Sequence, residues 1–259
     1  MAARPSLFTR DLSGLSQSSG PNAANISSPA EQRDDAKRNF LKAMRPLPTQ
    51  HYWNVYFDKQ SKDHKTSEEE YKVELERLGD QIESVQDFWK YNNNTPVEQI
   101  KTRESIYLFK QGFRPVWEDR RNINGGAWSF RVPKAIGPDV WNHVQLLAIG
   151  EELQSALDND DQICGVGFSV RFNSHLISVW HRDSSKKKSI DGILTCVTEK
   201  LPAELQPKPE NAFYKRHQDH AGFNPPPELR AVLDSQKRAE EREKEKAAAA
   251  AVGAVDGPA

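Results

Sequence analysis

The sequence has few of the features that mark membrane, secreted or disulfide-bonded proteins. Its 259 residues include only two cysteines, Cys164 and Cys196, whose spacing fits neither a disulfide framework nor a metal site. No apolar run approaches the length of a membrane span, and the first residues carry no targeting signal. We therefore expect a protein of a reducing compartment that uses no metal ion and no other cofactor.

An excess of charge of either sign is also missing. Lys and Arg number 36 against 37 Asp and Glu, which gives a formal net charge of −1. A protein that holds nucleic acid mainly through its phosphates needs a basic field, so any RNA contact should be local and chemically specific. The mean hydropathy of −0.79 is low for a chain packed throughout. We therefore expect part of the chain to be unstructured.

Composition divides the chain into three segments. Residues 1–43 are rich in Ser, Asn, Gly, Pro and Ala and are expected to be a disordered tail. Residues 44–225 carry strand and helix patterns and form the expected binding domain. Residues 226–259 are rich in Glu, Lys, Arg and Ala with mixed charge, which is typical of a solvent-exposed helix. This C-terminal tail is therefore expected to be partly helical.

Within the central segment, strand patterns outnumber helix patterns. Alternating apolar and polar residues predict strands that include residues 52–57, 104–110, 128–132, 163–172 and 176–180. Helix patterns cover residues 84–91, 139–158 and 190–201. Turns such as Asn124-Gly125-Gly126 join the strands as hairpins, which makes them antiparallel. The predicted fold class is α+β, with helices on one side of the sheet and the other side open for binding.

The segment from Phe113 to Phe130 places an aromatic ring, Trp117, directly beside a carboxylate, Glu118. Stacking of a base on such a ring contributes about 1–3 kcal/mol whatever the base. Base identity is read at the Watson–Crick edge, where a carboxylate can accept both guanine N–H bonds. Methylation at N7 makes guanine cationic and adds about 0.5–2 kcal/mol of cation–π attraction. The pair therefore predicts a pocket for an alkylated guanine.

Structural interpretations of the same residues remain open. Tryptophan is usually largely buried, so Trp117 can be a core aromatic and Glu118 a turn residue. Tyr71, at the far end of a polar loop, can simply anchor that loop. Trp89 shares a helix face with Val85 and either packs under a loop or contacts a partner.

Seven short motifs resemble, in order and spacing, the translation initiation factor 4E family of messenger-RNA cap-binding proteins. They are Val85-Gln-Asp-Phe-Trp89, Leu108-Phe-Lys, Pro115-Val-Trp-Glu-Asp119, Gly125-Gly-Ala-Trp128, Ile149-Gly-Glu151, Cys164-Gly followed by Ser-Val-Arg171, and Ile177-Ser-Val-Trp180. The resemblance covers about residues 46–220. It implies a curved antiparallel sheet of about eight strands, with three helices on the convex face and the cap in the open concave face.

The resemblance also implies roles for particular residues in the concave face. Tyr71 and Trp117 would sandwich the 7-methylguanine of a capped messenger RNA, and Glu118 would accept hydrogen bonds from its edge. Trp180 would touch the methyl group, and Arg171 would hold the triphosphate. The protein would then regulate translation initiation.

A second surface is implied on the convex face. Val85, Trp89 and Leu146 would dock a helical motif from the scaffold initiation factor 4G or from a 4E-binding repressor. Asn142 and His143 belong to the same surface, where they replace an apolar and an acidic residue. The protein would act as a monomer in the cytoplasm, with the nucleus and RNA granules as further locations.

The subclass within the family stays open. Tyr71 stands where the main members have a tryptophan, and tyrosine is the choice of the second class, whose members often repress translation. Trp53, in contrast, stands where the first class keeps a tryptophan. The sequence is therefore compatible with an initiation factor and with a cap-binding repressor.

Two functions of other classes fit the sequence less well. A hydrolase would need a nucleophile paired with a base, or a metal cluster, but His175, His181, His217 and His220 have no partner at a recognisable spacing. We therefore expect no enzymatic activity. An aromatic-lined module for carbohydrate or single-stranded RNA is chemically closer, but it would not need Glu118.

Overall fold

The computed structural model describes residues 28–43, 46–59, 75–235, 238–239 and 242. The chain divides into two compact units, Met1–Arg45 and Pro46–Ala259, each considered by itself. Tyr71 lies outside the described residues. None of the helices in the described ranges combines the length and the apolar character needed to cross a lipid bilayer.

In the first unit, the described part of the expected disordered tail is a helix. Helix α1 spans Pro29–Ala43 and has proline at its first position, where the missing N–H costs nothing. Its remaining residues are mostly strong helix formers such as Ala, Glu, Gln, Arg and Lys. Residues 29–43 are therefore helical, because their side chains favour a helix, although composition alone predicted disorder.

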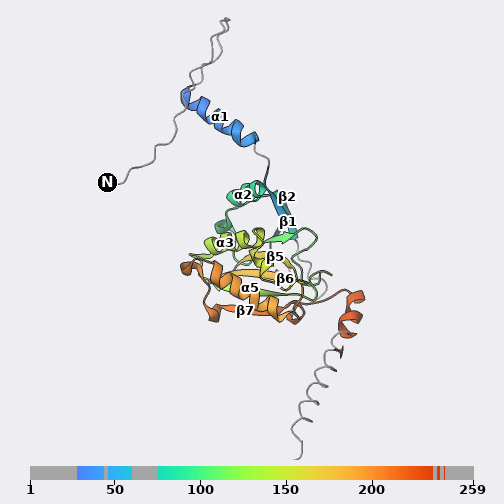
Figure 1. The fold of residues 1–259 in the computed structure, drawn as a ribbon. Helices are drawn as coiled ribbons and strands as arrows, with labels where there is room; N and C mark the ends of the chain where they lie inside the picture. Colours follow the sequence, from blue (N-terminus) through green and yellow to red (C-terminus); the bar gives the residue numbers. More distant parts are fainter. Residues whose placement is uncertain (1–27, 44–45, 60–74, 236–237, 240–241, 243–259) are drawn as a thin grey trace, which may run out of the picture. The chain divides into compact units, whose positions relative to one another are not determined.

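In the second unit, seven antiparallel strands form one curved sheet, in the order β2-β1-β3-β5-β6-β4-β7 (Figure 1). The strands are β1 Pro48–Asp58, β2 Leu75–Ser84, β3 Ser105–Lys110, β4 Gly126–Val132, β5 Ile163–Val170, β6 His175–His181 and β7 Ala212–Arg216. The predicted α+β class with an antiparallel sheet is confirmed. Seven strands lie in the described ranges, against the predicted eight or so.

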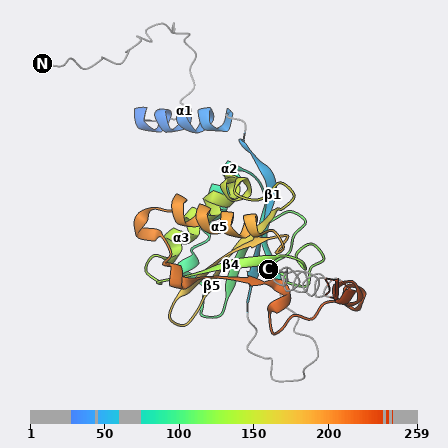
Figure 2. The same ribbon diagram turned by 60° about the horizontal axis from the view of Figure 1, so that its bottom comes forward.

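Helices α3 and α5 contact the sheet and lie on the same side of it (Figure 2). The helices of this unit are α2 Val85–Asn94, α3 Gly137–Ile149, α4 Glu152–Ser155 and α5 Lys187–Lys200. Short 3₁₀ turns follow at Val97–Gln99, Ala203–Leu205, Pro209–Asn211 and His217–Asp219. Residues 227–235 are also helical.

The start of α2 agrees with the capping signal in the sequence. The Ser84 hydroxyl accepts a hydrogen bond from the Asp87 backbone N–H at 3.1 Å, which satisfies one of the free N–H groups of the first turn. The predicted helix over residues 139–158 is, in contrast, interrupted. Helix α3 ends at Ile149, and Glu151 has a left-handed φ of 61° before α4 begins. Gly150 is the C-cap of α3, and its backbone N–H donates to the Leu146 carbonyl oxygen at 2.8 Å.

The main core lies between the sheet and the helices. Trp53, Leu108, Phe130, Phe168 and Val179 are completely buried there. A smaller cluster of buried residues is formed by Phe109, Phe113, Ala127, Cys164 and Trp180. Leu108 belongs to the first cluster and Phe109 to the second, because successive side chains of a strand point to opposite faces. The second cluster therefore lies on the sheet face away from the main core.

Two glycines in the central strand β5 make room for this second cluster. A Cβ atom at Gly167 would lie 2.6 Å from the ring of Tyr107 and 2.7 Å from the Ser178 hydroxyl. A Cβ atom at Gly165 would overlap the ring of Phe109 and lie 2.7 Å from the Leu108 carbonyl oxygen. The rings of β3 therefore lie across β5, close to its backbone.

Candidate nucleotide-binding site

Trp180 is the central aromatic residue of the second cluster. It is 5% exposed, and its neighbours across the sheet are Gly165 on β5 and Ala127 on β4, both small. Its Nε1 donates a hydrogen bond to the Ser178 hydroxyl at 3.2 Å. Its ring meets Phe109 edge to face, with centroids 5.4 Å apart. The indole is thus held in one orientation on the sheet face opposite the main core.

Trp117 and Glu118 lie together in the connection between β3 and β4. Both are half-buried, and Trp117 packs against the second cluster that contains Trp180. The fully buried Asn122 locks this connection, because its side-chain amide donates to the carbonyl oxygens of Arg114 and Val116. The predicted stacking residue, the predicted acceptor and Trp180 are therefore brought into one region.

The C-terminal segment covers this region. The His220 ring lies parallel to Trp117, with centroids 3.9 Å apart and an interplanar angle of 10°. The Asn224 backbone N–H donates a hydrogen bond to Glu118 Oε1 at 3.1 Å. Sequence reasoning missed both contacts, since the sequence contains no signal that pairs residues so far apart.

His217 lies beneath His220 and is completely buried. Its ring centroid is 4.4 Å from that of Trp180, and neither ring nitrogen has a hydrogen-bond partner among the described residues. Burial, with a smaller effect of His220 and His181, lowers the pKa of His217 to about 3. Burial also lowers the pKa of His220 to about 4, with Lys215 adding to the effect. Both rings are therefore neutral at pH 7.

Arg171 follows β5 and is exposed. Its guanidinium donates a long hydrogen bond of 3.4 Å to the Val170 carbonyl oxygen. Burial raises the pKa of Asp58, and the charge of Arg171 partly opposes that effect, so the two groups are neighbours. Arg171 therefore presents its charge at the end of β5 next to the end of β1, outside the aromatic cluster.

The predicted partner residues lie on α2 and α3. Trp89 is 42% exposed and Leu146 is 39% exposed, although both are large and apolar. Trp89 rests with its ring edge on the buried Phe88, at a centroid distance of 5.3 Å. The two helices are joined by a 3.1 Å hydrogen bond from Gln145 to Asn92. Trp89 is therefore a solvent-facing residue and is not packed under a loop of the described chain.

The other residues predicted for this surface are less exposed. Val85 is the first residue of α2 and is half-buried, as are Asn142 and His143 on α3. His143 Nδ1 lies 2.9 Å from the carbonyl oxygen of Asp139, one turn earlier in the same helix. This contact occupies one ring nitrogen of His143 within its own helix.

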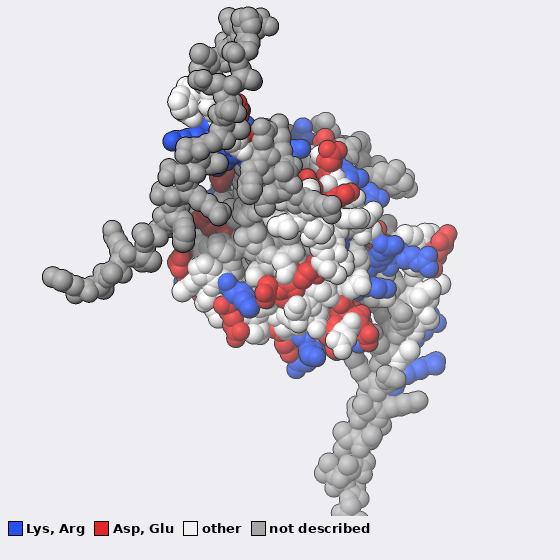
Figure 3. All heavy atoms as spheres, turned by 45° about the horizontal axis from the view of Figure 1, so that its top comes forward, with Lys and Arg blue, Asp and Glu red and all other residues white. Residues whose placement is uncertain are grey.

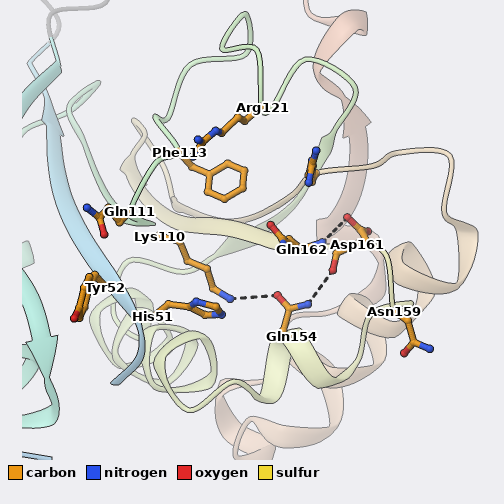
Figure 4. A pocket seen from close by; sticks show the side chains of 11 residues that line it. His51, Tyr52, Lys110, Gln111, Phe113, Arg121, Gln154, Asn159, Asp161 and Gln162 are labelled. Carbon is orange, nitrogen blue, oxygen red and sulfur yellow. Dashed lines mark hydrogen bonds between the residues drawn. The ribbon is translucent and has the colours of Figure 1, made fainter. Parts of the chain in front are cut away.

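A separate polar pocket of about 670 Å³ lies at the other end of β5 from Arg171. In Figure 4, the side chains of Lys110 and Gln154 point toward one another, and their hydrogen bond is 3.2 Å long. Lys110 also contacts Glu151 at 3.2 Å. The lining residues are His51, Tyr52, Lys110, Gln111, Phe113, Arg121, Gln154, Asn159, Asp161, Gln162 and Arg182. Neither Trp117 nor Glu118 belongs to this pocket.

Charges of both signs lie side by side on the face of the molecule that Figure 3 shows. Blue and red groups alternate over much of its described surface. This distribution agrees with the balanced net charge of the chain.

Comparison with known proteins identifies the family. The family model for eukaryotic initiation factor 4E matches residues 48–230, which is well over half of the chain. The chain belongs to this family. The predicted resemblance is thereby confirmed, and the 4E-family match begins at the first strand of the sheet.

Curated relatives of this 4E-family chain include proteins from plants and animals. It is 34% identical to the Arabidopsis thaliana eukaryotic translation initiation factor NCBP over 137 residues, which cover 51% of this chain and 60% of that protein. It is 33% identical to Drosophila melanogaster eukaryotic translation initiation factor 4E1 over 172 residues, which cover 65% of this chain and 61% of that protein. The chain thus spans about 60% of the length of these relatives.

Solved structures of the family share the fold. Ascaris suum eIF4E-3 in complex with an m2,2,7G cap is 26% identical with a TM-score of 0.56, and the match covers 70% of this chain and 97% of that one. Caenorhabditis elegans eIF4E-3 in complex with the 4E-binding protein Mextli is 26% identical with a TM-score of 0.58, and the match covers 68% of this chain and 96% of the other.

Proposed function

We propose that this 4E-family protein binds the 7-methylguanosine cap of messenger RNA. The observation that carries the proposal is the arrangement of Trp117, Glu118 and Trp180 on the sheet face opposite the main core. Trp117 supplies a stacking surface, and Glu118 supplies two acceptors for the N1–H and amino group of guanine. Trp180 adds an aromatic surface in the same cluster. Tyr71 would close the sandwich from the other side, and Arg171 would contact the phosphates.

The second part of the proposal concerns regulation of translation initiation. The exposed Trp89 and Leu146, with Val85, Asn142 and His143 beside them, form a surface for an amphipathic helix. The helix would come from the scaffold initiation factor or from a 4E-binding repressor. Tyr71 is the choice of the second class and Trp53 that of the first, so an initiation factor and a cap-binding repressor are both candidate roles. We expect the protein to act without catalysis, and in the cytoplasm, where messenger RNA is translated.

Calorimetric titration with 7-methyl-GTP and with GTP tests the base-recognition proposal. The cation–π contribution of about 1–2 kcal/mol predicts that 7-methyl-GTP binds several-fold to about thirtyfold more tightly. Glu118→Gln should weaken the binding of both nucleotides, because an amide offers one acceptor where the carboxylate offers two. Equal affinities of the wild-type protein for the two nucleotides would refute recognition of the methylated base. Undiminished binding by Glu118→Gln would point to an aromatic module that does not read the guanine edge.

A further inference from the structure

Residues 220–224 make two contacts that a bound guanine would also need. His220 lies flat on Trp117, as a base would, with a centroid distance of 3.9 Å. The Asn224 N–H donates to the Glu118 carboxylate, as the edge of guanine would, at 3.1 Å. Gly222 lies between these two residues, and a Cβ atom there would be 3.9 Å from the indole of Trp117. One short segment therefore occupies one face of the Trp117 indole and one carboxylate oxygen of Glu118.

The segment is held at its N-terminal end by buried structure. The His217 side chain is completely buried against Trp180, and the His217 backbone N–H donates to the Gly125 carbonyl oxygen at 3.0 Å. The turn then continues through hydrogen bonds from His220 N–H to the His217 carbonyl at 3.3 Å and from Phe223 N–H to the His220 carbonyl at 2.9 Å. This turn fixes the direction in which the chain leaves His217, and so it carries His220 onto Trp117.

The segment is also held at its C-terminal end. The side chain of Asn224 accepts a hydrogen bond from Arg230, in the helix of residues 227–235. Leu233 in that helix is buried at 6% exposure, so the helix is itself packed. The contacts that hold the cover are nevertheless few and mostly exposed, which is typical of segments that open at low free-energy cost.

We propose that residues 220–224 form an intramolecular cover that competes with the cap for Trp117 and Glu118. This inference rests on the proposed function of the same site. A ligand can bind only the fraction of molecules in which the cover is open, so the apparent dissociation constant exceeds the intrinsic one by the inverse of that fraction. The cover competes in the same way with methylated and unmethylated nucleotides, so it lowers both affinities by one factor and leaves their ratio unchanged.

Two substitutions in the full-length chain test the competition by calorimetry with 7-methyl-GTP. His220→Ala removes the ring that stacks on Trp117, and Asn224→Pro removes the N–H that reaches Glu118, because proline has none. Each variant should bind 7-methyl-GTP about 3- to 30-fold more tightly than the wild type, with the same factor for GTP. Asn224→Ala keeps the N–H and should shift the affinity less than Asn224→Pro. Glu228→Gln, at an exposed position beyond the cover, should leave the affinity at the wild-type value.

A second measurement needs no ligand. Quenching of tryptophan fluorescence by acrylamide should increase in His220→Ala, and the increase should vanish when Trp117→Phe is added. Unchanged quenching, or nucleotide binding that is equal to or weaker than that of the wild type in both variants, would overturn the cover. If neither the wild type nor the variants bind 7-methyl-GTP, both the competition and the proposed function are refuted. An increase in quenching in His220→Ala would then show that the contact between His220 and Trp117 exists and that only the proposed function is wrong.

Discussion

The Nδ1 atom of His181 lies 2.7 Å from the carboxylate of Asp161, and both side chains are completely buried. Asp161 also accepts backbone hydrogen bonds from Gln162 at 2.8 Å and Asp183 at 3.1 Å. The other ring nitrogen of His181 lies 2.7 Å from the Tyr214 hydroxyl. Since His181 follows Trp180 in β6, this network fixes the strand end that carries a proposed cap-binding residue.

Asp161→Ala should therefore destabilise the fold strongly. It leaves the buried imidazole and two part-buried backbone N–H groups without their acceptor, and we expect the free energy of unfolding to fall by about 3–5 kcal/mol. Urea denaturation at pH 7 measures this change. Asp161→Asn, which keeps one acceptor oxygen, should cost less. A loss below about 1 kcal/mol in Asp161→Ala would mean that the network does not stabilise the fold.

Trp117→Ala should weaken the binding of 7-methyl-GTP by at least about 2 kcal/mol, or roughly thirtyfold, because the stacking surface is lost. Calorimetry at fixed salt gives the dissociation constants. Trp117→Phe is the matched comparison, since it keeps a smaller aromatic face and should lose less. If both variants bind like the wild type, the base does not stack on this residue.

Arg171→Gln should separate recognition of the phosphates from recognition of the base. Loss of a charge-assisted contact should weaken 7-methyl-GTP by about 1.5–3 kcal/mol. The same substitution should change the affinity for 7-methylguanosine, which has no phosphates, by less than about 0.5 kcal/mol. A similar loss for both ligands would show that Arg171 acts on the base site or on the fold.

Trp89→Ala should abolish binding of a helical 4E-binding peptide in a pull-down and leave 7-methyl-GTP binding unchanged. Exposed aromatic residues at the centre of an interface commonly contribute 2 kcal/mol or more. Lys90→Ala, at the next and also exposed position of α2, is the control and should retain the peptide. Loss of cap binding together with retained peptide binding would mean that the two surfaces have been assigned the wrong way round.

The buried His217 predicts that stability falls in mild acid. Its pKa is lowered from 6.5 to about 3 in the folded protein, so below pH 6.5 the unfolded chain binds a proton that the folded chain does not. This one group should lower the free energy of unfolding by about 2 kcal/mol between pH 7 and pH 5. Urea denaturation at the two pH values should show the drop, and His217→Phe should reduce it. An equal drop in the variant would assign the effect to other groups.

The sequence predicted the parts of the fold that have a clear periodicity. In β1, Trp53 and Val55 face the main core while Tyr56 packs on the opposite cluster, as the alternation indicates. Strand β2, in contrast, was not predicted. Its sequence LERLGDQIES has few apolar residues, and only Ile82 and Ser84 are buried. It is an edge strand that forms by pairing with β1, and pairing leaves little trace in composition.

The candidate site was predicted in part. The motif around Trp117 and Glu118 was visible because the two residues are adjacent in the chain. The cover over them was not, because Asn224 and Glu118 are 106 positions apart and their contact uses a backbone N–H, which every residue except proline has. The role of Tyr71 stays a prediction.

The two glycines of β5 set the depth of the concave face. Because the rings of Phe109 and Tyr107 lie where side chains at Gly165 and Gly167 would be, the smallest substitution there, to alanine, would have to lift a ring. If the Phe109 ring were lifted from the sheet, it would press against Trp180, its edge-to-face neighbour. The space above this face of the sheet would then become narrower. The shape of the proposed binding face is thus governed from beneath by Gly165 and Gly167.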